Sequence, residues 1–101
     1  MTRSQKIILA DIICERQRQD KLVASGELPF NCADEEIDDA EKARVLGEEY
    51  GEVCKASYEL DHGWRGNSTS DWEARRAKQK AHLRTELLQL AAVCVAWAES
   101  L

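Results

Sequence analysis

Three glutamates crowd one short stretch of the sequence, VLGEEYGEVCKA, which covers residues 45–56. Glu48 and Glu49 are adjacent, and Glu52 lies one helical turn beyond Glu49. If Val45 is set at zero and each residue advances by about 100°, Glu49 falls at about 40°, in the middle of the apolar arc. An ionised carboxylate in an apolar interior is costly unless it is paired or bound to a metal. The stretch therefore predicts that these glutamates do not all lie on a solvated helix surface.

A second carboxylate and a guanidinium are also predicted to lie among apolar residues, elsewhere in the chain. Glu86 falls between Val93 and Trp97 on an apolar face, and Gln89 follows it by one turn. Arg16 lies in the middle of the apolar stripe of the N-terminal segment. A guanidinium that faces the interior needs an anion, so these groups are expected to be partnered.

Two interpretations of these charges remain open. In the first, Arg16 or another basic group neutralises Glu49, Glu52 and Glu86 in a buried ion-pair network. In the second, Glu49 and Glu52 lie on adjacent turns, Glu86 faces them from another helix, and the three bind a divalent cation. Carboxylate oxygens are suitable ligands for Mg²⁺. The ion usually keeps several bound waters, and substrate phosphates complete its coordination. Carboxylates brought close together also repel one another unless a cation lies between them.

The elements that must position these residues are three long helices. We expect the first over residues 4–24, ended by Gly26, and the second over 34–61. The third opens with SDWE at 70–73 and runs to the C-terminus, with a break near Lys80. No strand-like alternation occurs, so the sequence predicts a single all-α domain over residues 1–101.

The last helix is too apolar to be covered by one chain. Eleven of the twelve residues from Leu87 to Ala98 are apolar. A helix that is apolar all round must be covered all round, which two further helices of a small chain can hardly do. We therefore expect a homo-oligomer that completes a four-helix or larger bundle.

Composition excludes several classes of function. The chain has 101 residues, a net charge of −5 and no basic tract, which argues against a nucleic-acid polymer or an anionic membrane as partner. No apolar run is long enough to span a bilayer, and the N-terminus does not read as a signal peptide, so a cytoplasmic protein is expected. The four cysteines lack C-x-x-C spacing and are expected to be free thiols rather than zinc ligands.

Two segments, LGEEYGEVCKA and LRTELLQLAAVCVAWAE, resemble the MazG-like all-α nucleoside triphosphate pyrophosphohydrolases, in particular the small phage-type and bacterial MazG-related branch. The segment ILADIICERQRQDK is similar to their N-terminal ER-x-RQD helix. The family pattern is E-x-x-E on one helix and E-x-x-D on a later one. Glu49 and Glu52 match the first half, Glu86 matches the next acid, and Gln89 stands where the family has aspartate.

The resemblance implies a fold, a reaction and a site. The three helices would form a MazG-like bundle, as a homodimer or homotetramer. A nucleoside or deoxynucleoside triphosphate would be hydrolysed between the α and β phosphates to a monophosphate and pyrophosphate. Mg²⁺, with Mn²⁺ as a second candidate, would be the cofactor. Its ligands would be Glu49, Glu52, Glu86 and Gln89.

The same resemblance suggests roles for other residues and leaves one alternative. Glu48 and Glu49 would activate the attacking water. The candidates for contacts to the substrate phosphates are Arg16, Lys21 and Lys55. Because an amide carries no charge, Gln89 also fits a catalytically weak or inactive homologue that acts as a nucleotide-binding or protein-interaction oligomer.

Overall fold

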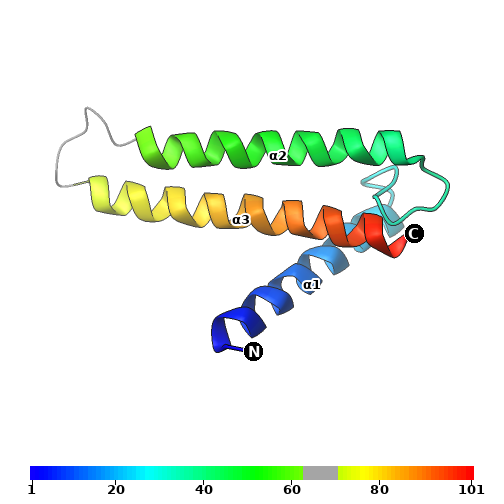
Figure 1. The fold of residues 1–101 in the computed structure, drawn as a ribbon, viewed down its shortest axis with the longest axis horizontal. Coiled ribbons are helices and arrows are strands. Elements are labelled where there is room, and N and C mark those ends of the chain that lie inside the picture. The colour runs from blue at the N-terminus through cyan, green and yellow to red at the C-terminus, as the bar shows by residue number, and fades with distance from the viewer. Residues whose placement is uncertain (63–70) are drawn as a thin grey trace.

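Three α-helices make up the computed structural model, which describes residues 1–62 and 71–101 (Figure 1). Helix α1 covers Arg3–Ala24, α2 covers Asp39–His62 and α3 covers Trp72–Glu99, and no strand occurs in the described ranges. The predicted all-α class is confirmed. The predicted break near Lys80 is wrong, because residues 72–99 contain no glycine or proline that would interrupt the helix. Ser70 lies outside the described residues.

Local side-chain chemistry sets the ends of α1. Thr2 and Gln5 form a capping box, in which each side chain accepts a hydrogen bond from the other residue's backbone N–H. Ser25 caps the C-terminus, and Gly26 follows it with φ of 81°. This left-handed conformation is readily adopted by glycine, which explains the predicted end of the helix.

The second helix begins at Asp39 rather than near Asp34, which corrects the sequence prediction. The Asp34 carboxylate accepts a hydrogen bond from the Glu36 backbone N–H at 2.9 Å, which closes a turn instead of a helix. Asp38 then accepts from the Glu41 N–H at 2.8 Å and acts as the N-cap. The acidic residues 34–36 were expected to form the N-terminal turn of this helix, where they would interact favourably with the helix dipole. They lie instead in a turn that precedes the helix.

The N-cap of α2 gives a first testable prediction. Replacing Asp38 by Ala should lower stability by about 1 kcal/mol, because the N–H of Glu41 loses its acceptor. For a chain of this size the melting temperature should fall by about 4–8 °C in a circular dichroism melt. Glu35→Ala, which removes an exposed acid of the same segment, serves as the control. Equal melting temperatures for the two variants would contradict this assignment of the cap.

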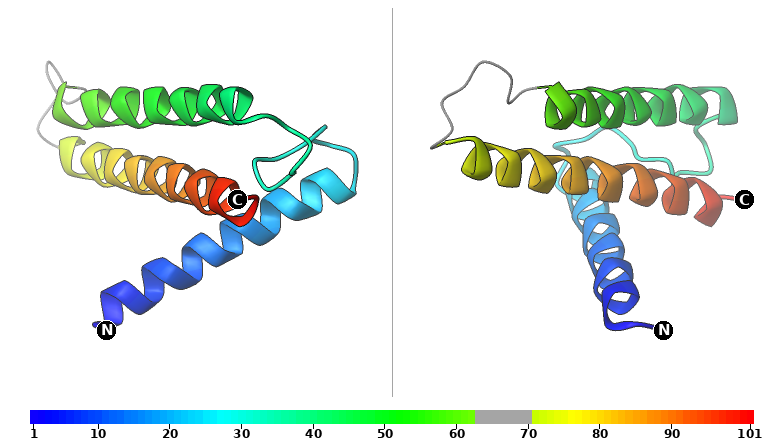
Figure 2. Two further views of the ribbon diagram at one scale, coloured as in Figure 1. Left: turned by 45° about the vertical axis from the view of Figure 1, so that its right-hand side comes forward. Right: turned by 60° about the vertical axis from the view of Figure 1, so that its left-hand side comes forward.

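Helices α2 and α3 lie antiparallel and side by side. Helix α1 crosses α3 obliquely, near the C-terminal half of α3 (Figures 1 and 2). Helix α3 packs against both of the others, whereas α1 and α2 make no direct backbone approach to each other. Two hydrogen bonds fasten the start of α2 to the end of α3. Trp97 Nε1 donates to Asp39 Oδ1 at 2.8 Å, and the buried Lys42 donates to Ser100 Oγ at 2.7 Å.

The interior of the single chain is small. Within the described residues, the buried apolar side chains are Cys32, Ala56, Ala92, Val93 and Ala96. The radius of gyration is 16.1 Å, whereas a compact domain of 100 residues has a radius of about 13 Å. The fold is therefore open and leaves large apolar side chains exposed. No helix of the described chain is long and apolar enough to cross a membrane.

Candidate functional site

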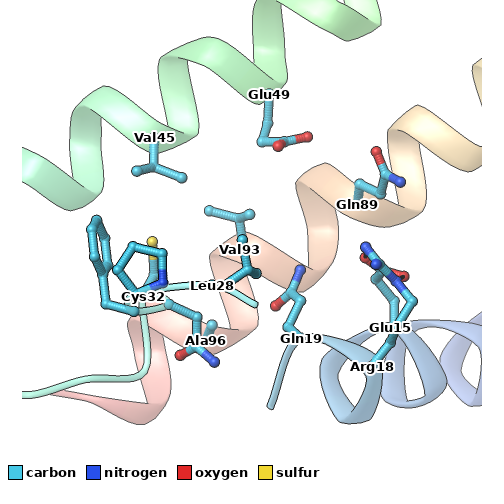
Figure 3. A pocket seen from close by; sticks show the side chains of 13 residues that line it. Glu15, Arg18, Gln19, Leu28, Cys32, Val45, Glu49, Gln89, Val93 and Ala96 are labelled. Atoms are coloured by element: carbon cyan, nitrogen blue, oxygen red, sulfur yellow. Dashed lines mark hydrogen bonds and ion pairs between the residues drawn. The ribbon is translucent and has the colours of Figure 1, made fainter. Parts of the chain in front are cut away.

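A hollow of about 350 Å³ lies where the three helices meet the segment 28–32 (Figure 3). Its apolar lining comes from this segment, α2 and α3, and consists of Leu28, Pro29, Phe30, Cys32, Val45, Val93 and Ala96. Its polar lining comes from all three helices and the same segment, and consists of Glu15, Arg18, Gln19, Asn31, Glu49 and Gln89. The hollow thus has an apolar side and a side rich in hydrogen-bonding and charged groups.

Glu49 projects from α2 into this hollow, and Gln89 projects into it from α3 (Figure 3). Glu49 is half-buried, as its place in the apolar arc predicts. Burial raises the pKa of the Glu49 carboxyl, and the charges of nearby carboxylates raise it further. In decreasing order of effect these neighbours are Glu86, Glu52, Glu15 and Glu48. The position favours a proton or a cation at Glu49.

Glu86 lies on α3 one turn before Gln89 and is 9% exposed, so its predicted inward orientation is confirmed. His82 Nε2 lies 3.7 Å from a Glu86 oxygen. Glu86 is not among the residues that line the hollow, but its charge has the largest effect of any carboxylate on the pKa of Glu49. Glu52 is exposed one turn after Glu49. The fold therefore brings Glu49, Glu86 and Gln89 into one neighbourhood, with Glu52 at its margin.

Other residues singled out from the sequence lie away from the hollow. Glu48 is exposed and forms an ion pair with Arg44, which also pairs with Glu41. Lys21 and Lys55 are both exposed, and neither lines the hollow. None of these three side chains lines the hollow.

Arg16 is buried, as its place in the apolar stripe predicts, and its partners are now identified. Its guanidinium donates to Glu99 at 2.6 Å, to Gln19 at 3.0 Å and to Asp20 at 3.0 Å. Arg16 is thus not the group that neutralises the central glutamates, and the ion-pair interpretation stays open only for another basic group. The residue fastens α1 to the C-terminal end of α3 instead.

Sequence reasoning missed the cation that does reach the hollow. Arg18 donates to both oxygens of Glu15, at 2.6 and 2.8 Å, and this pair lines the polar side. The bonds to Glu15 and the charge of Glu49 hold the pKa of Arg18 above its ordinary value. Arg18 belongs to the same ERQRQD stretch as Arg16. Arg18 lies outside the apolar stripe of this helix, so the sequence pattern carried no signal for its place at the hollow.

Within the described residues, the side chains around Glu49 do not by themselves complete a metal centre. No three His, Cys, Asp or Glu side chains of residues 1–62 and 71–101 gather closely enough to hold a metal ion. Mg²⁺, however, is commonly bound through one or two carboxylates together with substrate phosphates. Glu49, Glu86 and the amide oxygen of Gln89 are compatible with that mode.

No family model, curated protein or solved structure matches this chain. The resemblance to MazG-like proteins therefore rests on the quoted motifs. Any function has to be argued from the chemistry of the hollow and of the residues around it.

Proposed function

We propose that this protein is a Mg²⁺-dependent, MazG-like nucleoside triphosphate pyrophosphohydrolase, which converts (d)NTP to (d)NMP and pyrophosphate. One observation carries the proposal: Glu49 lies half-buried in a hollow, surrounded by carboxylate charge, with Gln89 across from it. Unfavourable clusters of like charge at a cavity are typical of functional sites. The four free cysteines are consistent with a reducing, cytoplasmic location.

In this proposal Glu49, Glu86 and Gln89 would hold the cation, and Glu52 would be a further ligand one turn from Glu49. Mg²⁺, or Mn²⁺ in its place, would offset phosphate charge and polarise the phosphoryl oxygens. Water oxygen bonds to the α-phosphorus, its proton passes to a carboxylate oxygen of Glu49, and the bond to the bridging oxygen breaks to release pyrophosphate. Glu48 could take that role only after leaving Arg44.

The apolar side of the hollow supports a nucleoside as the non-phosphate part of the substrate. Phe30, Leu28 and Val45 line it from the loop and from α2. A nucleobase or sugar buries apolar area there while the phosphates remain on the polar side. This arrangement of an apolar wall with a few directed polar groups is typical of small-molecule sites.

The experiment that tests the proposal is turnover of the common NTPs and dNTPs by the purified chain, with Mg²⁺ or with EDTA. We expect pyrophosphate release that requires the metal and whose rate differs between nucleotides according to base or sugar. Absence of release from every nucleotide by folded protein in Mg²⁺ would refute the assignment.

We further propose that a second copy of the chain covers the outer face of α2 and α3. A hollow of about 400 Å³ on this face is almost wholly apolar, and its lining includes Leu46, Tyr50, Leu90 and Cys94. Tyr50 is 61% exposed, and Leu87 on α3 is 47% exposed. The small core and large radius of gyration support the same conclusion, because the single chain leaves apolar area unburied.

The interface is testable with one substitution. Leu87→Glu should convert the oligomer to a monomer, because a charge in an apolar interface costs far more than one in water. Light scattering behind a sizing column should give a dimer or tetramer for wild type and 11.4 kDa for the variant. Leu101→Glu at the exposed C-terminus is the control. A wild-type protein that is monomeric at tens of micromolar would contradict the proposal.

Two observations favour a second candidate function, a nucleotide-binding or protein-interaction oligomer without turnover. Gln89 lacks the charge of an acid, and within the described residues no three His, Cys, Asp or Glu side chains are grouped closely enough to hold a metal ion without it. A binding module would show nucleotide binding by calorimetry, with no pyrophosphate released. The enzyme would show both.

A further inference from the structure

A second hollow of about 370 Å³ lies beside the first, toward the N-terminal half of α1. The two hollows share Glu15, Arg18 and Gln89. The second is bounded by α1 and α3, with Asp11 and Arg84 among its lining residues. The side of the first hollow that carries Glu15, Arg18 and Gln89 therefore adjoins a space lined by two arginines.

Each arginine is held by one carboxylate and is still accessible. Arg84 Nη2 donates to Asp11 at 2.7 Å, and Arg18 binds Glu15 through Nε and Nη2. The Arg18 and Arg84 side chains are 54% and 50% exposed. A guanidinium has five N–H donors, so within these pairs Arg84 keeps those on Nε and Nη1, and Arg18 keeps those on Nη1.

We propose that the second hollow binds the β and γ phosphates of the substrate, and then the leaving pyrophosphate, through Arg18 and Arg84. The proposal rests on the proposed function, because it assigns an order to the parts of the same substrate. Along the two hollows the order is apolar wall, then Glu49 with Gln89, then the two arginines. This matches nucleoside, α phosphate, then β and γ phosphates. Guanidinium groups bind phosphate oxygens through paired, charge-assisted hydrogen bonds.

In this arrangement Asp11 and Glu15 make the subsite selective for multidentate anions. In the free protein each carboxylate neutralises its arginine, so the hollow carries no surplus charge from these four groups. An entering anion must compete with the carboxylates for the guanidinium N–H groups. A multidentate anion such as Mg²⁺-pyrophosphate competes better than a single carboxylate.

The competing explanation is that Asp11 and Arg84 only fasten α1 to α3. The two explanations differ in the effect of removing the carboxylate. If Arg84 binds phosphate, Asp11→Asn frees it and strengthens anion binding. If the pair is only a fastening, Asp11→Asn gives no tighter binding.

The test is calorimetric titration of the full chain with pyrophosphate in Mg²⁺ at fixed salt. Arg84→Gln should weaken binding about tenfold, as expected for loss of a charge-assisted hydrogen bond. Asp11→Asn should tighten binding about threefold. Arg75→Gln, which removes an exposed arginine of α3 outside both hollows, should bind like wild type.

Folding and charge are controlled within the same series. The double variant Asp11→Asn/Arg84→Gln keeps the pair neutral and should still bind weakly, so that its weakness reflects the lost guanidinium rather than a bare carboxylate. Circular dichroism melts show that each variant is folded. The inference is overturned if Arg84→Gln binds as wild type, or if Asp11→Asn binds no more tightly than wild type.

Failure of this inference is distinguishable from failure of the proposed function. If NTPs are hydrolysed but the variants leave pyrophosphate affinity unchanged, the enzyme assignment stands and the subsite is refuted. If pyrophosphate affinity follows the expected pattern without NTP turnover, the anion subsite stands and the hydrolase assignment fails.

Discussion

Replacing Glu49 by glutamine is expected to reduce NTP hydrolysis by about a thousandfold, the order found when a general base is removed. The amide keeps the shape of the side chain but cannot accept the proton from water, and it carries no charge for a cation. The rate of pyrophosphate release in Mg²⁺ is the measurement. A variant that retains a tenth of the wild-type rate would contradict the assignment of Glu49.

The same substitution should make the protein more stable at neutral pH. Because the folded-state pKa of Glu49 is raised, the folded protein carries an unfavourable charge above that pKa. As pH falls through the raised pKa toward the ordinary value, the folded state takes up a proton before the unfolded state does, and wild type recovers stability. Glu49→Gln removes this cost at all pH values. Its advantage should therefore appear at pH 7 and shrink toward pH 4.

The size of the gain is modest because Glu49 is only half-buried. We expect about 0.5 kcal/mol, or about 2–4 °C in melting temperature, in EDTA. Glu48→Gln, next in the chain, should give no such gain, because Glu48 is exposed and paired with Arg44. A Glu49→Gln variant that melts below wild type at pH 7 would show that the carboxylate stabilises the fold rather than serving a site.

The second large effect is expected at Arg16. Arg16→Ala should lower the free energy of unfolding by about 2–3 kcal/mol, because three hydrogen bonds and the packing of a buried side chain are lost together. Arg18→Ala on the same helix should cost less than about 1 kcal/mol, since its ion pair with Glu15 is largely exposed on the arginine side. Urea unfolding of both variants provides the comparison.

The contrast between the two arginines also separates a structural role from a substrate role. In our assignment Arg16→Ala loses stability, whereas Arg18→Ala keeps the fold and raises the KM for nucleotide. The opposite pattern, a stable Arg16→Ala with a raised KM, would return Arg16 to the phosphate-contact role that the sequence suggested.

Helical periodicity explains what could be predicted from the sequence. It identified three helices, and it placed Glu49, Glu86 and Arg16 on inward faces, where the structure has them half-buried or buried. These are local properties, because the face of a residue follows from its spacing to apolar neighbours on the same helix.

Tertiary geometry explains what could not be predicted. Arg16 pairs with Glu99 from the far end of the chain, and no periodicity reveals such a partner. Arg18 lies outside the apolar stripe of α1, and it lines the hollow only because of the way α1 crosses α3. Helix α2 starts later than predicted because the Asp34 side chain accepts a backbone hydrogen bond that closes a turn. Acidic composition alone does not show whether such a residue will begin a helix or close a turn.

Phosphorus NMR of one reaction, an NTP or dNTP with the chain and Mg²⁺, most directly tests whether Glu49 serves cleavage between the α and β phosphates. We expect signals of a nucleoside monophosphate and pyrophosphate to grow together in wild type and to be absent with Glu49→Gln. Formation of nucleoside diphosphate and orthophosphate, equal turnover by the variant, or an unchanged spectrum for every nucleotide with folded protein would contradict that claim.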